Sequence, residues 1–430
     1  MNRQLIEPPN DFVAQAYHDD TLPRVPGGAR ASEGSDLLRA RLRKTHKSHA
    51  RPPFECIALL LQGGGALGAY QAGVYEALAE ARVDPDWVSG ISIGAINAAL
   101  IAGNPPEARV DVLRQFWNLV TEPLTTVAEN FGCIWPCAVG FGGGVGRGFV
   151  NRMNAALALL RGVPGFFAPR VPALWLQAAG TPGATSFYDT TQLKTTLERL
   201  VDFDRINAGP MRFSIGAVNV SSGNFVYFDN STHTIGPEHV MASGALPPGL
   251  PAVEIEGEYY WDGGLVSNTP LQWVLESEPR QDTLAFQVDL WSARGALPRN
   301  LAEVITRQKE IQYSSRTRAN SDRFKHMQLL RNALSHLLQK LPPELGDSPE
   351  ADLLRPVAGH KVYNLVQLIY RSRTYEGDSK DYEFSRRSME EHWRVGYRDT
   401  VRTLRHPQVL ARPTNHAGVF TFDLARDGRE

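Results

Sequence analysis

The chain has 430 residues, 42% of them hydrophobic, which is enough to bury a large core and more than one mid-sized α/β domain needs. The 45 basic and 46 acidic side chains nearly cancel, so the net charge of -1 gives no overall attraction to nucleic acid or to an anionic membrane. Because the only cysteines are Cys56, Cys133 and Cys137, we expect a reducing compartment, no disulfide framework and no zinc site.

Residues 1–53 are polar and are interrupted by prolines and glycines. This composition predicts a mobile N-terminal arm with one short helix around residues 36–47. Glu7 and Asp11 stand where a secretory signal would need an apolar core, and no other stretch is long and apolar enough to span a bilayer. The simplest location is therefore cytoplasmic, and we expect any membrane contact to be local and peripheral.

The first predicted strand, residues 56–61, is fully apolar and leads directly into a glycine loop. Gly63, Gly64 and Gly65 are consecutive, so their backbone N–H groups are not shielded by side chains. Such groups can bind the oxyanion that forms during acyl transfer. The loop therefore indicates an oxyanion hole.

A dinucleotide site is the competing interpretation of this loop. Gly63, Gly65 and Gly68 fit the G-x-G-x-x-G fingerprint between a strand and a helix. That fingerprint requires an acidic residue at the end of the second strand, whereas Asp84 and Asp86 precede the second strand here. The pattern thus favours the oxyanion hole and keeps a non-enzymatic dinucleotide-binding module as an alternative.

A Gly-x-Ser-x-Gly pattern runs from Gly90 to Gly94. A short apolar strand precedes it, and residues 93–102 predict an apolar helix. This context suits a nucleophile elbow, in which the serine occupies a sharp turn between residues too small to clash. Ser92 is the candidate nucleophile, and the N–H of Ile93 is a further oxyanion donor. A serine in a glycine-lined turn without any function is the competing interpretation.

Residues 121–186 interrupt the alternation of strands and helices with glycines, prolines and aromatic residues, around an amphipathic helix predicted at 150–160. This insertion is either a cap over the cleft that meets an acyl chain or membrane interface, or a packed loop whose aromatic side chains complete the core. The regular pattern returns with a helix at 190–200, a strand at 212–220 and a hairpin strand at 224–228.

A carboxylate stands out at residues 259–264, where Asp262 follows a strand-prone aromatic run. Gly263 and Gly264 permit a tight turn that brings the Asp262 side chain close to another backbone. An Asp-Gly pair is also common in ordinary turns, so this motif carries little weight alone. Asp289 is a weaker candidate because no glycine turn exposes it.

The C-terminal part changes character. A helix is expected after Pro270 and a buried strand at 283–290, and a charge-rich helical pattern follows at 301–340. One more strand is expected within 358–370 and a last helix at 385–404.

A serine hydroxyl needs a base within hydrogen-bonding reach. A Ser-His-Asp triad esterase therefore remains an alternative, although the late histidines all lie in polar or helix-patterned stretches. They are His326, His336, His360, His392, His406 and His416.

Taken in order, the glycine loop, the elbow and the Asp-Gly-Gly turn resemble the patatin-like phospholipases, which are lipid acyl hydrolases with a Ser-Asp dyad and no catalytic histidine. The resemblance covers residues 57–289 and implies Ser92 as nucleophile and Asp262 as its base. It also implies an oxyanion hole at Gly63, Gly64, Gly65 and Ile93, supported by the motif glycines Gly68, Gly90, Gly94, Gly263 and Gly264.

The resemblance further implies a three-layer α/β/α sandwich with a mainly parallel sheet. We expect a catalytic domain at 54–292 and an accessory, mostly helical region at 293–430. No metal or organic cofactor is implied, the substrate is a lipid or another hydrophobic acyl ester, and nucleic acid is not a partner. The chain departs from many family members at Leu67, where they carry a basic residue.

Overall fold

The fold is seen in a computed structural model that describes residues 42–47, 50–122, 144–172, 176–314, 317–373 and 375–424. The strands are β1 (Cys56–Leu61), β2 (Trp87–Ile91), β3 (Ala168–Pro169), β4 (Tyr188–Asp189), β5 (Arg212–Asn219), β6 (Phe225–Asp229), β7 (Val253–Ile255), β8 (Glu258–Asp262), β9 (Thr283–Asp289), β10 (Tyr363–Ile369) and β11 (Val419–Phe422).

The longer helices are α2 (Ala69–Glu80), α3 (Ile93–Ala102), α4 (Arg109–Val120), α6 (Gly144–Arg161), α7 (Thr191–Leu200), α11 (Leu301–Tyr313), α12 (Thr317–Leu338) and α15 (Arg386–Leu404). The shorter ones are α8 (Phe203–Ala208), α9 (Pro237–Ser243), α10 (Leu271–Glu276), α13 (Pro343–Gly346) and α14 (Pro349–Leu354). Among the described helices, none has the length and apolar character needed to cross a bilayer.

Most described strands join one sheet in the order β11-β10-β9-β1-β2-β5-β8-β7, with β6 also paired to β5. The pairs from β11 to β5 are all parallel, whereas β6, β7 and β8 are joined in antiparallel pairs. Every residue of β1, β2 and β9 is buried, as the continuous apolar runs of these strands predict for parallel strands covered on both faces. The expected mainly parallel sheet is confirmed.

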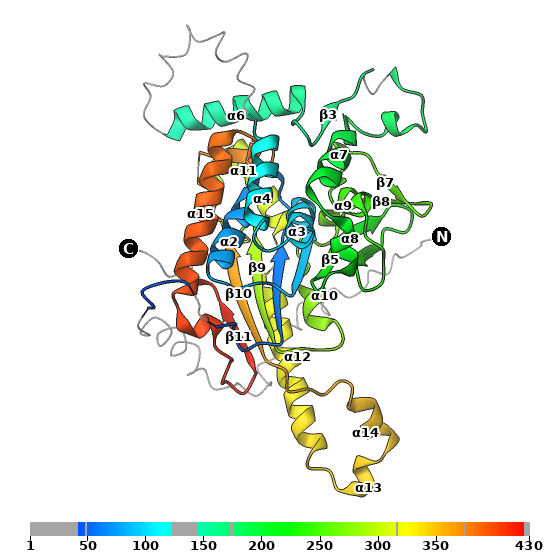
Figure 1. Cartoon of the computed structure of the whole chain (residues 1–430), viewed down its shortest axis with the longest axis vertical. Coiled ribbons are helices and arrows are strands. Elements are labelled where there is room, and N and C mark those ends of the chain that lie inside the picture. Colours follow the sequence, from blue (N-terminus) through cyan, green and yellow to red (C-terminus); the bar gives the residue numbers. More distant parts are fainter. Residues whose placement is uncertain are drawn as a thin grey trace, which may run out of the picture. The chain divides into compact units, whose positions relative to one another are not determined.

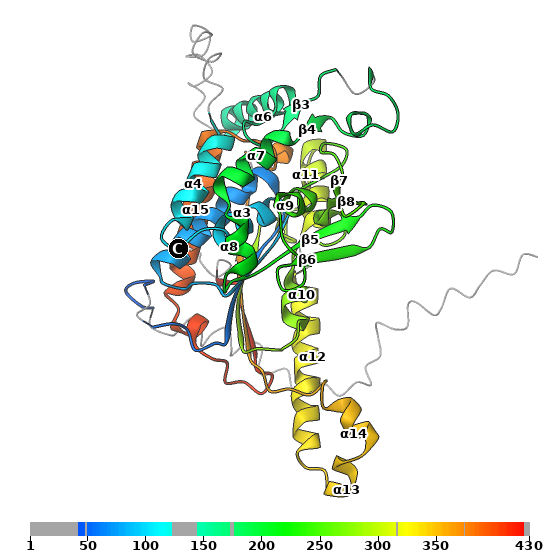
Figure 2. The ribbon, with the colours of Figure 1, turned by 45° about the vertical axis from the view of Figure 1, so that its right-hand side comes forward.

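Helices cover both faces of this sheet (Figures 1 and 2). One face carries α2, α3, α4 and α15, and the other carries α10 and α12. On the second face, Leu271 and Leu275 of α10 and Phe324 of α12 pack against inward side chains of β1, β9 and β10. The three-layer α/β/α arrangement expected from the family resemblance is therefore confirmed.

The C-terminal residues extend the same sheet. Tyr363 to Ile369 pair in parallel with Thr283 to Asp289, and β11 pairs in turn with β10. Helix α15 lies directly against α2, where a Cβ on Gly73 would stand 1.9 Å from the Trp393 carbonyl oxygen. The mostly helical C-terminal region is present, and it is continuous with the layers that hold the catalytic candidates.

Several local expectations differ in extent from the observed elements. The long pattern at 301–340 is divided between α11 and α12, and α6 begins earlier than the predicted amphipathic stretch. No helix is present in residues 42–47, while the remainder of the helix predicted at 36–47 lies outside the described residues. Cys133, Cys137 and the first aromatics of the insertion also lie outside them.

Candidate active site

The candidate residues gather where strands β1 and β2 end. The glycine loop follows β1, and Ser92 follows β2 directly. Ile91 pairs with Gly216 of β5, while the next residue of β5, Ala217, pairs with Asp262 of β8. This register places Ser92 and Asp262 at the same level on either side of β5.

Ser92 occupies a strained turn between β2 and α3. Its φ of 56° and ψ of -124° lie in a region that non-glycine residues rarely adopt. The backbone packs closely here, since a Cβ on Gly94 would stand 2.2 Å from the Leu61 carbonyl oxygen. The Ser92 N–H donates to the carbonyl and hydroxyl oxygens of Ser243, both at 3.1 Å. These features are those of a nucleophile elbow.

Asp262 ends β8 with its side chain turned into the protein, where the residue is only 2% exposed. Its carboxyl accepts a hydrogen bond from the Ser92 side chain and one of 2.7 Å from the Gly264 N–H. Burial raises the pKa of this carboxyl to about 6, and the two hydrogen bonds oppose that rise. The structure thus brings together two side chains about 170 positions apart in the chain.

The glycine loop lies against these two residues. A Cβ on Gly63 would stand 3.0 Å from the Ser92 Cβ. The Gly63 N–H donates to the Asn268 carbonyl at 3.4 Å, whereas those of Gly64 and Gly65 have no acceptor among the described residues. The N–H of Ile93 at the start of α3 likewise has none there. The N–H groups of Gly64, Gly65 and Ile93, which follow Gly63 and Ser92 in the chain, therefore have no acceptor among the described residues.

Three side chains that no sequence motif singled out hold the glycine loop in place. Gln62 accepts from the backbone N–H groups of Leu290 and Trp291 at 2.6 and 2.9 Å. Asn268 donates 3.1 Å to the Gly63 carbonyl, and the Trp291 indole donates 3.0 Å to the same oxygen. These contacts orient the Gly63 peptide. Two weak signals for these side chains are present in the sequence: Gln62 directly precedes the glycine loop, and Asn268 follows the Asp-Gly-Gly turn by four residues.

Residues of the C-terminal region also contact the glycine loop. Gly65 has a φ of +54°, and a Cβ there would stand 2.1 Å from the Asp381 carbonyl oxygen. The same oxygen accepts 2.8 Å from the Ala66 N–H, and the Asp381 carboxylate pairs with Lys309 of α11 at 2.9 Å. Tyr313, the last residue of α11, accepts from Gln62 and Asn268 through its carbonyl. Nothing in the local sequence pattern predicts these contacts.

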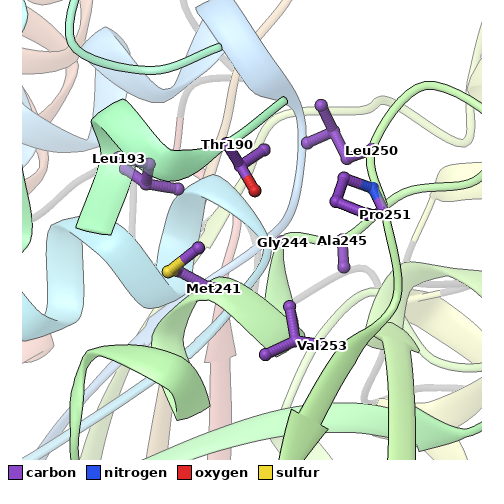
Figure 3. Close-up of a pocket in the computed structure, with 8 residues that line it drawn as sticks. All are labelled: Thr190, Leu193, Met241, Gly244, Ala245, Leu250, Pro251 and Val253. Carbon is purple, nitrogen blue, oxygen red and sulfur yellow. The ribbon is translucent and has the colours of Figure 1, made fainter. Parts of the chain in front are cut away.

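An apolar pocket adjoins the elbow (Figure 3). Gly244 lies next to Ser92, and the carbonyl of Ala245 accepts 3.0 Å from the Asp262 N–H. The pocket is lined by Thr190, Leu193, Met241, Gly244, Ala245, Leu250, Pro251 and Val253. Part of this lining belongs to residues 242–251, a segment rich in small residues and prolines.

The alternative site residues lie elsewhere. Asp86 precedes β2 and accepts 2.7 Å from the Ile57 N–H, so it lies at the amino ends of the strands, away from the glycine loop. Among the described residues, the groups that set the pKa of Asp262 are Ser92 and Gly264, with no histidine. His392, for example, lies 3.6 Å from Glu376. Asp289 accepts instead from the Gln287 amide.

Models of known protein families match two parts of this chain. The family model of the patatin-like phospholipases matches residues 59–274, half of the chain. The chain belongs to the patatin-like phospholipase family. A second family model, described as patatin phospholipase, matches residues 311–416. The C-terminal region of this patatin-like protein therefore has recognisable relatives of its own.

Individual relatives match over limited lengths. Patatin-like phospholipase domain-containing protein 7 of Rattus norvegicus is 41% identical over 74 residues, which is 17% of this chain and 5% of that protein. Lysophospholipase NTE1 of Yarrowia lipolytica is 24% identical over 255 residues, 59% of this chain and 14% of that protein. The patatin-like chain thus spans only a small part of these relatives.

Among solved structures, VipD from Legionella pneumophila is similar to this patatin-like chain at 15% identity and a TM-score of 0.34. The alignment covers 85% of this chain and 71% of the VipD chain.

The patatin-like chain departs from many family members in its glycine loop. Leu67 replaces the basic residue noted there, and its side chain is fully buried. Leu67 therefore faces the core and supplies no cation to the site.

Proposed function

We propose that this chain is a serine acyl hydrolase that cleaves ester bonds of lipids. The observation that carries the proposal is the contact of Ser92, on its strained elbow, with a buried carboxyl whose pKa is raised to about 6. A base with a pKa just below neutrality is ionised at pH 7 and still accepts a proton readily. No histidine is needed to activate the hydroxyl.

In the first half-reaction, the Ser92 oxygen attacks the ester carbonyl carbon while its proton passes to Asp262. The carbonyl oxygen becomes an oxyanion that accepts hydrogen bonds from the N–H groups of Gly64, Gly65 and Ile93. The tetrahedral intermediate then collapses, and the leaving alcohol takes the proton from Asp262. The product is an acyl ester of Ser92.

In the second half-reaction, Asp262 takes a proton from water as the water oxygen attacks the acyl ester. The intermediate collapses, the Ser92 oxygen recovers the proton, and the free acid leaves. Gly63 serves as a spacer in this scheme, because its N–H is already donated to Asn268 and its bare Cα lies against Ser92.

Two observations support a lipid as the substrate. The side chains around the pocket beside Ser92 are mainly apolar, but the pocket is closed in this structure, so a hydrocarbon chain would fit only after these side chains move apart. The matched relatives include proteins named lysophospholipase and patatin-like phospholipase domain-containing protein. Phospholipids and lysophospholipids are therefore the first substrates to test.

The proposal is tested with a fluorophosphonate probe and a panel of phospholipid, lysophospholipid and short-chain esters. We expect a single label on Ser92, and loss of both labelling and hydrolysis in Ser92→Ala. Asp262→Asn should retain the fold and lose nearly all turnover. Ser222→Ala, in the exposed turn between β5 and β6, is the matched control and should behave as the parent protein. Hydrolysis that survives in Asp262→Asn would remove that residue from the mechanism.

A further inference from the structure

Helix α6 carries its large apolar side chains on the outside. Phe149, Met153, Leu159 and Leu160 are exposed, with Leu160 74% exposed. Phe149, Met153 and Leu160 recur at the spacing of one helix face, and Leu159 lies at the margin of that face. The residues that α6 buries are small, such as Ala155. A surface helix of a globular protein normally has the opposite arrangement, with its large apolar side chains inside.

Helix α11 is inverted in the same way. Two of its charged side chains face the protein, where Lys309 pairs with Asp381 at 2.9 Å and Glu310 pairs with Lys380 at 2.8 Å. Its large apolar side chains face outward, and Leu301 is 74% exposed. They are Leu301, Val304, Ile305 and Ile311. Two helices that expose apolar faces indicate an interaction surface.

Both helices border the candidate active site. They contact the same short turn, Gly377–Ser379, and are therefore neighbours. Helix α11 ends at Tyr313, whose carbonyl accepts hydrogen bonds from Gln62 and Asn268 beside the glycine loop. The Leu159 carbonyl of α6 accepts from the Tyr188 hydroxyl, close to the segment that lines the pocket in Figure 3.

The charge of α6 identifies the kind of surface that fits it. The sequence of this helix contains three arginines and no acidic residue. Arg147 is paired with Glu391, whereas Arg152 and Arg161 are exposed beside the apolar face. Apolar side chains flanked by exposed arginines suit a lipid surface with anionic headgroups better than a neutral one.

We propose that the exposed apolar faces of α6 and α11 dock onto an anionic phospholipid surface. This docking surface comprises Phe149, Met153, Leu159, Leu160, Leu301, Val304, Ile305 and Ile311. The proposal rests on the proposed function in one respect, since docking would present ester bonds of the lipid layer to Ser92. Binding itself requires only the surface, so the two can be tested separately.

The binding test uses the full chain carrying Ser92→Ala, so that vesicles stay intact. Co-sedimentation is measured with vesicles of phosphatidylcholine and with vesicles that also contain phosphatidylglycerol. We expect binding that is stronger on the anionic vesicles and at least about tenfold weaker after Leu160→Ser with Phe149→Ser, or after Leu301→Ser with Ile305→Ser. Replacing Arg152 and Arg161 by glutamine should reduce only the preference for anionic vesicles.

Leu353→Ser is the matched control. Leu353 is 77% exposed on α14. Figures 1 and 2 show α14 and α6 at opposite ends of the described fold. This variant should bind vesicles as the parent does. In chains that retain Ser92, all surface variants should hydrolyse a soluble short-chain ester at the parent rate.

The outcomes separate the possibilities. Absence of vesicle binding in the parent, or equal binding by the serine variants, overturns the docking surface. A dimer in sedimentation velocity that the same variants dissociate, without vesicle binding, assigns the surface to a second copy and also overturns the proposal. Vesicle binding in a protein that shows neither probe labelling nor hydrolysis supports the docking surface and refutes the proposed function.

Discussion

At the scale of one residue, the burial of Asp262 is what would make its carboxyl a suitable base in the proposed mechanism. A carboxyl in water is a weak base, and its basicity rises here because the charged form has lost most of its hydration. The hydrogen bonds from Ser92 and the Gly264 N–H prevent the pKa from rising further. The proposed mechanism needs this balance, since the carboxyl must be ionised before reaction and must hold a proton during it.

The first prediction concerns the pH profile of ester hydrolysis. Because the pKa of Asp262 is raised to about 6, kcat/KM should fall roughly tenfold for each pH unit below that value. Steady-state rates with a soluble ester, measured between pH 4 and 8, test this. The acidic limb should shift little with temperature, as for a carboxyl. A limb that moves with temperature as imidazole ionisation does would assign the base to a histidine.

The second prediction concerns stability. The folded protein binds the Asp262 proton more tightly than the unfolded chain does, so this residue lowers stability as pH rises from about 4 through 6. Above that range the charged carboxyl costs the fold up to roughly 3 kcal/mol. Asp262→Asn should therefore unfold at higher urea concentration than the parent at pH 8 and at a similar one at pH 4. A less stable variant at pH 8 would contradict this.

At the scale of the element, the local motifs were predictable and their supports were not. The strand at Cys56–Leu61 and the helix at Ile93–Ala102 have the predicted bounds, because apolar runs and flanking glycines are local signals. The Asp381 carbonyl behind Gly65 and the Trp291 indole on Gly63 come from more than 200 positions away. A backbone carbonyl has no sequence signature, so only the fold reveals it.

In the insertion at residues 121–186, too, the composition was apparent from the sequence, whereas the position of each aromatic side chain was not. In the described part of residues 121–186 some aromatic side chains fit the packed-loop interpretation, while the interpretation as a cap over the cleft stays a prediction. Phe166 and Phe167 are buried and pack near Phe384, as aromatic residues completing a core would. Phe149 is exposed on α6. Aromatic composition alone could not separate these roles, because the outward direction of one helix face depends on what the rest of the fold places beneath it.

The third prediction tests the support of the glycine loop by α11. Lys309→Met removes the ammonium that pairs with the Asp381 carboxylate, so the chain around Asp381 should become more mobile. The Asp381 carbonyl would then hold the Ala66 N–H of the glycine loop less firmly. Loss of one oxyanion donor costs about 100-fold or more in kcat, so partial misplacement should cost at least about tenfold with little change in KM. Steady-state kinetics on a soluble ester measure both constants.

Two further variants control this experiment. Lys309→Arg keeps the charge and should restore part of kcat. Arg355→Met removes an exposed ion pair with Asp352 on α14 and should have no effect. Equal changes in kcat for Lys309→Met and Arg355→Met would show that α11 does not position the loop.

At the scale of the whole molecule, the predicted boundary at residue 292 crosses a continuous sheet. Strand β10 pairs with β9 along seven residues, and α15 covers the helix that follows the glycine loop. Trp393 and Tyr397 of α15 donate hydrogen bonds to Glu76 and Glu80 of α2. The change to charge-rich helices after residue 292 suggested a separate region, yet the later strand and helix are partners of the earlier ones.

The last prediction follows from this continuity. A chain ending at residue 292 would leave the β9 edge and the α15-facing side of α2 uncovered, so it should aggregate or unfold without a cooperative transition. Circular dichroism during urea unfolding measures this. As a matched deletion, residues 341–358 are replaced by a short Gly-Ser linker, which the contact between Gln339 and His360 allows. That protein should unfold cooperatively, since only α13 and α14 are removed. Cooperative unfolding and ester hydrolysis by the chain ending at 292 would instead establish residues 54–292 as an independent catalytic domain.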